Sequence, residues 1–403
     1  MRISICKWFN NAESPVIFMI DDLCNTWVDT GNKGYREWGD DWGFFKREEK
    51  SSFRYLNEQI LALFPEVKVT FFVPVGIRAG ISVHPLYQQI SRPLDADEES
   101  RGFFKFIHQH PKFELAYHGT THGNPGEAAR DFVQEWHTFH TIEEAVETIR
   151  AGLVTFQNAA GERPSGGKYC GYAGSKLADE SIDRSGFTWW CRYWNHGYED
   201  MGDGPDYGED ADPISRYEIK RFGANGVIDI PSTVNGGLLR GLTSPDYSFK
   251  GIAKRALKRP LIRYRLRKLD YLLKHRLVIS IQEHIAPSRD DGKIQHPNIF
   301  HDRNSLVEIF RYLATKKVWY CTGTELADYV NLRDHIKLVQ IDESGFELVH
   351  DLRYENWQIS LQVEDSKGMH ILAPDHRKFA VLQGAVNLPV MQGKYLLQRG
   401  GVY

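Results

Sequence analysis

Short apolar runs alternate along the chain with segments whose apolar residues recur at helical spacing. Each run is long enough for one buried strand; the runs cover residues 16–20, 67–75, 113–117, 186–190, 222–231, 277–282 and 318–320. Helical spacing covers residues 53–64, 141–160, 305–313 and 324–330. Ser51 and Ser52 before the first helix, and Thr141 and Gly161 around the second, are typical capping residues. Strands that alternate with helices predict an α/β fold with a parallel sheet.

The pattern changes after about residue 335. Residues 347–349, 358–363 and 379–382 form short apolar or alternating stretches between turn residues, which is typical of a small all-β unit. The sequence therefore predicts an α/β domain over residues 1–334 and a β-rich C-terminal domain over residues 335–403. Insertions into the first domain are expected at about residues 25–50, 81–112 and 198–275.

Composition narrows the class of protein. The chain has 403 residues, 41% of them hydrophobic, so a sizeable core is available, and a net charge of −3 gives no bulk attraction to nucleic acid or membrane. The five cysteines lack a CxxC pair, which disfavours a disulfide framework or a cysteine zinc site. The chain has no run of about 18 apolar residues and no signal-peptide pattern at its start. We therefore expect no transmembrane segment and a cytoplasmic location.

Candidate chemistry follows the ends of three predicted strands. His118 and His122 would stack on one face of a helical turn, and two such imidazoles can bind a divalent metal with a third ligand, usually a carboxylate. Taken alone, the pair is better explained as a solvated surface turn. However, Asp21 and Asp22 end one apolar run and His284 ends another. Because the carboxyl ends of parallel strands meet at one edge, a site is predicted there.

The same stretches carry a family resemblance. Five pieces occur in the family's order: Ile20-Asp21-Asp22, Val69-Thr70-Phe71-Phe72-Val73, His118-Gly119-Thr120-Thr121-His122, the helix over 143–161, and the strand over 278–284. Over roughly residues 14–330 the chain resembles the NodB-like polysaccharide deacetylases, carbohydrate esterase family 4. The resemblance implies a distorted (β/α) barrel and a metal-dependent amide hydrolase.

The resemblance also implies roles for individual residues. Asp22, His118 and His122 would hold a divalent metal, usually zinc, while Asp21 would act as the general base and His284 as the general acid. Three protein ligands leave open positions for water and an acetyl carbonyl. The metal would acidify that water and polarise the carbonyl.

Some positions depart from the family pattern. Leu23 stands where the first motif usually continues with glycine. The third motif has two candidates, at residues 163–166 and 168–171, which leave Arg163, Lys168 and Tyr169 as candidates for substrate or oxyanion contacts. Trp190 is a further candidate, because either it or Trp194 could be the tryptophan of the fourth motif. Trp27, Trp38 and Trp42 could stack on sugar rings or anchor the loop that carries them.

These observations predict an N-deacetylase that hydrolyses the acetamido group of an N-acetylated sugar, in a polysaccharide or in a biosynthetic intermediate of a surface polysaccharide. The basic stretch 250–276 has two interpretations: it could attract a carrier-linked, anionic substrate, or it could be a solvated helix face. An inactive carbohydrate-binding or scaffolding protein on the same fold is the alternative. Nucleic-acid binding through residues 250–276 is disfavoured by the near-neutral total charge. The sugar and the oligomeric state are left open.

Overall fold

The fold is taken from a computed structural model, which describes residues 2–29, 41–43, 51–195, 200–201, 214–243, 258–286, 289–293, 295–342, 344–352 and 357–399. By their internal contacts the described residues form two compact units. The larger unit spans residues 16–315 and 320–324, and the smaller takes in 1–15, 316–319 and 325–403. The boundary predicted between residues 334 and 335 stays a prediction, and the smaller unit also contains the N-terminal segment and most of helix α9 (Gly323–His335).

A curled, mainly parallel sheet organises the larger unit. Within the described residues its strands follow the order β13 (Lys220–Phe222), β14 (Val227–Asp229), β10 (Trp189–Cys191), β9 (Gly166–Lys168), β6 (Phe113–Tyr117), β4 (Val69–Val73), β2 (Ser14–Asp21), β16 (Ile279–His284) and β15 (Val234–Asn235). Neighbours along this path are parallel except for β13 and β14, which are antiparallel. The α/β barrel-like fold class predicted from the sequence is therefore confirmed.

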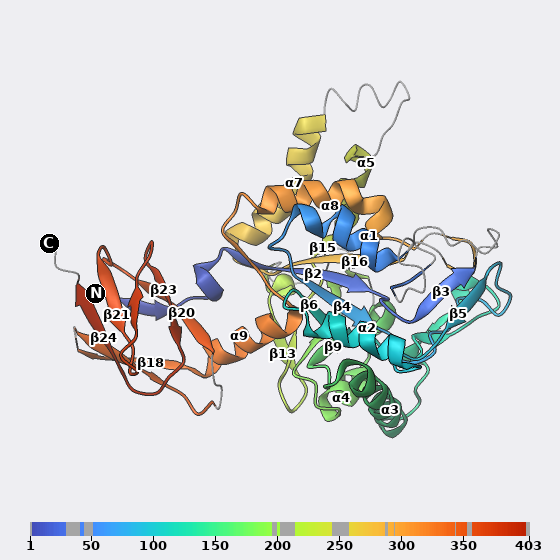
Figure 1. Ribbon diagram of the computed structural model, residues 1–403, viewed down its shortest axis with the longest axis horizontal. Helices are drawn as coiled ribbons and strands as arrows, with labels where there is room; N and C mark the ends of the chain where they lie inside the picture. The colour runs from blue at the N-terminus through green and yellow to red at the C-terminus, as the bar shows by residue number, and fades with distance from the viewer. Residues whose placement is uncertain are drawn as a thin grey trace. The chain divides into compact units, whose positions relative to one another are not determined.

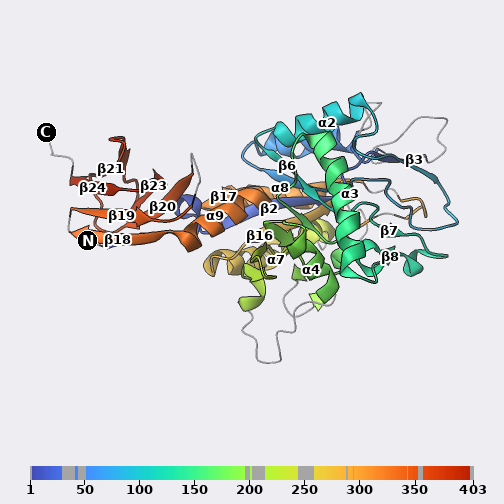
Figure 2. The ribbon, with the colours of Figure 1, turned by 90° about the horizontal axis from the view of Figure 1, so that it is seen from below.

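Helices cover the outside of this sheet. They are α1 (Ser52–Gln59), α2 (Glu98–Gln109), α3 (Ile142–Ala160), α4 (Lys176–Arg184), α5 (Arg240–Thr243), α7 (Lys258–Lys274) and α8 (Ile299–Leu313). Figure 1 shows α1, α7 and α8 along one side of the sheet and α2, α3 and α4 along another. Figure 2 shows α2 and α3 side by side from the second direction. Each of α1 to α4 joins two successive parallel strands, as a βαβ arrangement requires.

Local sequence explains where these elements begin and end. Every residue of β2, β4 and β6 is buried, as expected for parallel strands that are covered on both faces. The Thr141 side chain accepts a hydrogen bond from the Glu144 backbone N–H, and Gly161 ends α3 with a φ of 96°. Ser51 caps α1 in the same way through Arg54. These three caps are the ones that the sequence predicted.

Apart from helix α9 and a short 3-10 helix at Phe9–Asn11, the regular elements that the structure describes in the smaller unit are strands. One sheet has the order β1 (Ile3–Ile5), β20 (Gln358–Val363), β23 (Ala385–Pro389); the other has the order β18 (Lys337–Asp342), β19 (Gly345–Val349), β24 (Lys394–Arg399), β21 (Met369–Leu372), β22 (Lys378–Ala380). Their core includes Phe346, Leu361 and Tyr395, together with Leu332 of α9. The predicted all-β C-terminal strands are thus present.

Two stretches contain helices beyond those predicted from the sequence pattern. The helix in segment 81–112 was not predicted, and the helix in the basic stretch 250–276 was predicted only in part. The segment 81–112 contains α2, which begins at the capping residue Asp97 and buries Phe104 and Ile107. The basic stretch contains α7, which buries Leu266, Leu269, Leu272 and Leu273. Short pairs join β3 (Thr26–Asp29) with β5 (Gln88–Ser91), β7 (Gly123–Asn124) with β8 (Val133–Gln134), and β11 (Trp194–Asn195) with β12 (Asp200–Met201), while β17 spans Val318–Tyr320.

The structure does not describe residues 30–40, 44–50, 196–199, 202–213 and 244–257. Trp38, most of the predicted loop 25–50 and a large part of the predicted insertion 198–275 therefore lie outside the described residues. Among the helices that the structure does describe, none has both the length and the apolar character needed to cross a membrane.

Candidate active site

Strand register alone brings the predicted residues to one edge of the sheet. Asp21, the last residue of β2, pairs in register with His284 on β16 and with Phe72 on β4. Next along the sheet, Tyr117 ends β6 and pairs with Gly167 of β9, so that His118 and Lys168 follow at the same level. The carboxyl ends of four parallel strands therefore supply the site, as the sequence predicted.

Asp21 lies at the centre of this edge and is almost completely buried. The Lys168 Nζ donates to Asp21 Oδ2 over 2.7 Å and to the Gln282 Oε1 over 2.5 Å. The Nε2 atoms of His118 and His284 lie 3.8 and 3.9 Å from the same carboxylate oxygen. Asp21 Oδ1 has no hydrogen-bond partner among the described residues. One carboxylate oxygen is thus fixed by a lysine, and the other is free to accept a proton.

Asp22 is fully buried and faces different partners. The Arg78 Nε and Nη2 atoms each lie 3.3 Å from one Asp22 oxygen, and the Gln295 amide donates to Oδ2 over 3.0 Å. The His122 Nε2 lies 3.4 Å from Oδ1. Burial raises the pKa of Asp22, but Arg78 and the neighbouring imidazoles more than offset this and hold the pKa well below its usual range. Asp22 also has a left-handed φ of 68°, a conformation that is uncommon outside glycine.

The segment from His118 to His122 is an irregular loop, so the helical turn considered for it is wrong. Glu135 is buried and accepts the backbone N–H groups of Thr120, Thr121 and His122 over 2.7–2.8 Å. Burial raises the pKa of Glu135, and these three hydrogen bonds offset part of the rise. The two imidazoles are therefore brought together by a carboxylate that folds the loop, and their ring centroids lie 5.2 Å apart.

The hydrogen bonds of the imidazoles fix which nitrogen is available. His118 Nδ1 lies 2.9 Å from the Lys168 carbonyl oxygen, and His284 Nδ1 lies 2.6 Å from the Pro297 carbonyl oxygen. A carbonyl only accepts, so each Nδ1 carries a proton. In the neutral ring of His118 this leaves a lone pair at Nε2. His122 Nδ1 has no partner among the described residues. Burial lowers the pKa of both His118 and His122, which favours the neutral, ligating form.

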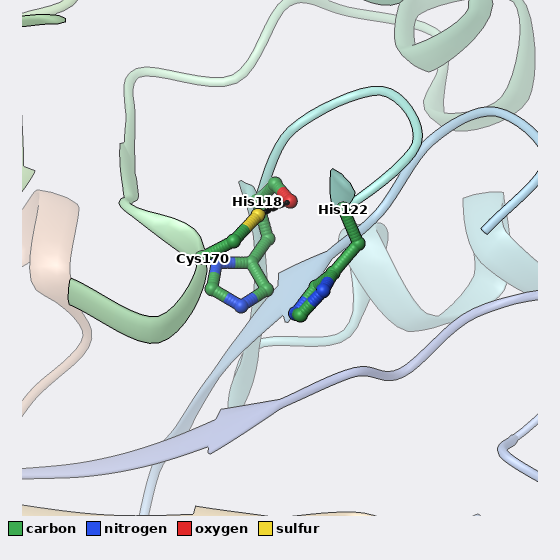
Figure 3. Close-up of side chains that lie close together, drawn as sticks. All are labelled: His118, His122 and Cys170. Carbon is green, nitrogen blue, oxygen red and sulfur yellow. Dashed lines mark hydrogen bonds between the residues drawn. The ribbon is translucent and has the colours of Figure 1, made fainter. Parts of the chain in front are cut away.

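The described residues also contain one cluster of metal-type ligands, His118, His122 and Cys170 (Figure 3), whose ligand atoms lie within 4.8 Å of one another. The Cys170 thiol, however, donates to the His118 carbonyl oxygen over 2.9 Å. Burial raises the pKa of this thiol well above its usual value, and a thiol binds metal only as the thiolate. Figure 3 shows the sulfur directed at that carbonyl, away from the tips of both imidazoles.

Two imidazoles and the Asp22 carboxylate are the ligand types that a catalytic zinc ion takes. The lone pair at His118 Nε2 fits a bound cation, and His122 Nε2 lies 3.4 Å from Asp22 Oδ1. The hydrogen bond from His118 Nδ1 to the Lys168 carbonyl is the kind of contact that orients metal-bound histidines. The residue types therefore fit a divalent metal, although Asp22 already forms an ion pair with the guanidinium of Arg78.

A cavity of about 660 Å³ is lined by His118 and His122, whereas Asp22 is not among its lining residues. Its lining includes Asp21, Arg78, both histidines of the loop and His284 at the base, and Phe132, Tyr172 and Arg289 among the other residues. The Tyr172 hydroxyl donates to Ser232 over 2.8 Å, and its ring lies 4.2 Å from the Lys168 Nζ. The cavity thus combines a charged floor with aromatic walls, a combination that suits a polar ligand with apolar faces.

The remaining predicted residues divide into two groups. Of the two candidates for the third motif, the second reaches the site through Lys168, whereas Arg163 is exposed and donates to the Ser185 carbonyl. Tyr169 and Trp190 are fully buried behind the cavity and pack against each other. The Tyr169 hydroxyl donates to Asp179 over 2.7 Å. None of Arg163, Tyr169 and Trp190 is among the residues that line the cavity.

Sequence reasoning did not single out Arg78, Gln282 or Glu135. Arg78 follows the predicted strand 67–75 by three residues, so the strand-end argument that found Asp21 could also have found it. Gln282 lies within a predicted strand and contacts Lys168. Nothing in the sequence marks Glu135, because its partners are backbone groups. Trp42 is fully buried, and its ring centre lies 4.2 Å from the Arg78 guanidinium carbon. It therefore supports the position of the Arg78 side chain.

Comparison with known proteins gives matches among solved structures. No family model and no curated protein sequence matches the chain. A polysaccharide deacetylase structure from Mycobacterium smegmatis matches at 14% identity over 82% of this chain and 94% of that one, with a TM-score of 0.45. One from Pseudomonas aeruginosa matches at 12% identity over 81% and 93%, with a TM-score of 0.44. Puue allantoinase matches at 14% identity over 81% and 92%, with a TM-score of 0.44.

Proposed function

We propose that the protein is a metal-dependent N-deacetylase that hydrolyses the acetamido group of an N-acetylated sugar. The observation that carries the proposal is the placement of Asp21, held by Lys168 and facing His284, beside His118, His122 and Asp22. A base, an acid and two of the three proposed metal ligands line one cavity, while Asp22 is buried beside them. These are the parts that amide hydrolysis by water requires.

In this proposal Asp22, His118 and His122 hold the metal, which we expect to be zinc. Bound there, a divalent ion would supply Lewis acidity to the acetyl carbonyl and acidify the attacking water. Cys170 is left out of this set because its thiol donates to the His118 carbonyl and burial raises its pKa well above the usual value. His118 and His122 present neutral nitrogen lone pairs without any preceding deprotonation, because burial already lowers both pKa values.

Asp21 takes the proton of the attacking water through its unpartnered Oδ1. Lys168 keeps the carboxylate oriented through Oδ2 and compensates its charge in a water-poor site. The water oxygen bonds to the acetyl carbon, and the carbon–nitrogen bond then breaks. His284, as an imidazolium whose Nδ1 donates to the Pro297 carbonyl, gives the proton on Nε2 to the departing amine. The products are acetate and the free amino sugar, and the proton that His284 gives is replaced by the one that Asp21 received.

The substrate is proposed to be a polysaccharide or a biosynthetic intermediate of a surface polysaccharide, handled in the cytoplasm. The support is the family resemblance of the motifs and a cavity of about 660 Å³, large enough for more than one sugar residue. The aromatic rings of Phe132 and Tyr172 at its wall offer faces for sugar rings. The proposal allows a substrate that is linked to an anionic carrier, and it allows the protein to be an oligomer.

The experiment that tests the function is acetate release from a panel of N-acetylated mono- and oligosaccharides, free and nucleotide-linked. Zinc-reconstituted protein is compared with protein stripped by a chelator and with the Asp21→Asn variant, which keeps the metal ligands. We expect release only by the reconstituted wild-type protein. Stoichiometric, tight sugar binding without acetate release from any substrate would favour the inactive carbohydrate-binding alternative instead.

A further inference from the structure

Arg78 is a buried cation in direct contact with a residue to which the proposed function gives a metal-binding role. Its side chain is 1% exposed, and its Nε and Nη2 atoms span the two oxygens of Asp22 at 3.3 Å each. This two-pronged contact is the geometry in which a guanidinium pairs most specifically with a carboxylate. Arg78 therefore uses the same two oxygens that Asp22 would offer to a metal ion.

The surroundings hold Arg78 in this position from several sides. Its guanidinium carbon lies 4.2 Å from the ring centre of Trp42, a stacking contact with a fully buried ring. Its backbone N–H donates to the Ser91 hydroxyl, and its carbonyl accepts from the Gln89 side chain, both over 2.8 Å. The main chain at Arg78 is thus fixed independently of Asp22, so a metal ion could not displace the whole residue.

The two carboxylates of the site are each already compensated. Lys168 pairs with Asp21 and Arg78 pairs with Asp22, so the four side chains carry no net charge between them. The remaining ligands, His118 and His122, are imidazoles, which add no negative charge. A divalent ion at Asp22 would therefore bring two positive charges close to a fixed guanidinium, without an uncompensated carboxylate to offset them. In a buried site this repulsion is screened weakly.

We propose that Arg78 is a positioning residue that orients Asp22 and weakens divalent-metal binding at the site, so that the protein holds its metal in an exchangeable form. This inference rests on the proposed function, because it takes Asp22, His118 and His122 as the metal ligands. It goes beyond that function because it assigns to this chain a built-in limit on metal affinity.

The test measures the affinity of chelator-stripped, full-length protein for Zn²⁺ by competition with a chromophoric chelator. Arg78→Met removes the charge but keeps a side chain that can pack on Trp42, and Arg78→Gln keeps a hydrogen bond to Asp22. Arg78→Lys keeps the charge. Arg289→Met is the matched control, because Arg289 also lines the cavity but pairs with Asp291. Thermal melts confirm that each variant is folded, and either neutral variant is sufficient if the other does not fold.

We expect Arg78→Met and Arg78→Gln to bind Zn²⁺ about tenfold more tightly or better, which corresponds to a modest change in local Coulomb repulsion. Arg78→Lys and Arg289→Met should stay within about threefold of the wild-type protein. Equal or weaker binding by the neutral variants, with stoichiometric binding by the wild type, would overturn this inference alone. Failure of the wild type and both neutral variants to bind Zn²⁺ would overturn the metal-dependent function as well.

Discussion

The Nζ of Lys168 lies 2.7 Å from the Oδ2 of Asp21, and both side chains are buried. The two residues are 147 positions apart in the chain, and the pairing of β9 with β6 and of β2 with β4 places them at one sheet edge. Removing one partner of such a pair leaves an uncompensated buried charge, which is far more costly than the pair itself is stabilising. Lys168 is thus tied both to the fold and to the proposed base.

Lys168→Met should therefore reduce both activity and stability. We expect kcat for acetate release to fall by about 10²–10³-fold, as for loss of a general base, and the free energy of unfolding to fall by about 3–5 kcal/mol. Lys168→Arg, which keeps a donor and the charge, should recover part of both. Urea unfolding and steady-state kinetics measure the two effects. Lys176→Met, at an exposed lysine of α4, is the matched control. Wild-type kcat in folded Lys168→Met would contradict the role given to this contact.

The metal ligands give a second prediction, in which metal content and activity change together. His122→Ala and Asp22→Ala should each lose the bound ion and acetate release, because each removes one of three protein ligands. Metal analysis by mass spectrometry on the purified variants measures the first quantity. His140→Ala, at an exposed histidine that precedes α3, should keep both. Full activity in a metal-free Asp22→Ala protein would refute the proposed metal site.

The sequence predicted the strand-end part of the site but not what holds it together. Asp21, His118 and His284 follow buried apolar runs, and strand period together with the rule for parallel sheets was sufficient to place them at one edge. The loop from His118 to His122 was mispredicted because its shape depends on Glu135, whose partners are backbone N–H groups. A side chain that acts on the backbone 13 to 15 residues away leaves no periodic trace in a sequence.

Long-range pairing limited the fold prediction in the same way. Strand β1 begins at Ile3 and pairs with Val363, a partner that no local pattern indicates. Helix α2 was missed because Gly102 interrupts its pattern, although its acidic first turn and the helical spacing of Phe104 and Ile107 favour a helix. By contrast, the helix with both caps in the sequence, α3, was predicted to within one residue at its start.

Cys170 gives a third prediction, which separates two possible ligand sets. The sulfur lies close to both imidazoles, but its proton is directed at the His118 carbonyl. We expect Cys170→Ser, which keeps a donor for that carbonyl, to retain one ion per chain and near-wild-type kcat. Metal content and acetate release measure this directly. Loss of the ion in folded Cys170→Ser, with retention in Asp22→Asn, would make the cysteine the third ligand and Asp22 a bystander.

His284 gives a fourth prediction, in which kcat and KM respond differently. His284→Gln cannot donate a proton to the departing amine, so kcat should fall by about 10²–10⁴-fold. KM and metal content should change little, because His284 contacts Asp21 and the Pro297 carbonyl rather than the proposed metal ligands. An unchanged kcat, or a loss confined to KM, would show that His284 binds the substrate instead of acting as the acid.

Asp229 gives a prediction about stability and pH that does not depend on the reaction. It lies on β14, is 4% exposed, and burial raises its pKa to about 7, because the Arg192 guanidinium at 3.6 Å offsets only part of the desolvation. Since the folded-state pKa lies above the unfolded value, the folded protein binds the extra proton between about pH 4 and pH 7. Stability from this group is therefore present at low pH and is lost as the pH rises through 7.

Asp229→Asn removes this titration while keeping the shape of the side chain. The free energy of unfolding of the variant minus that of the wild type should rise by about 1.4 kcal/mol per pH unit between pH 4 and pH 7, and level off above. Urea titrations at each pH measure the difference, in which contributions from other groups cancel. The exposed Asp131, whose side chain accepts from the Ala128 N–H, supplies Asp131→Asn as the control, for which we expect no such slope. A difference that is flat with pH, or that falls, would mean that Arg192 compensates Asp229 fully and that the carboxylate is ionised throughout the range.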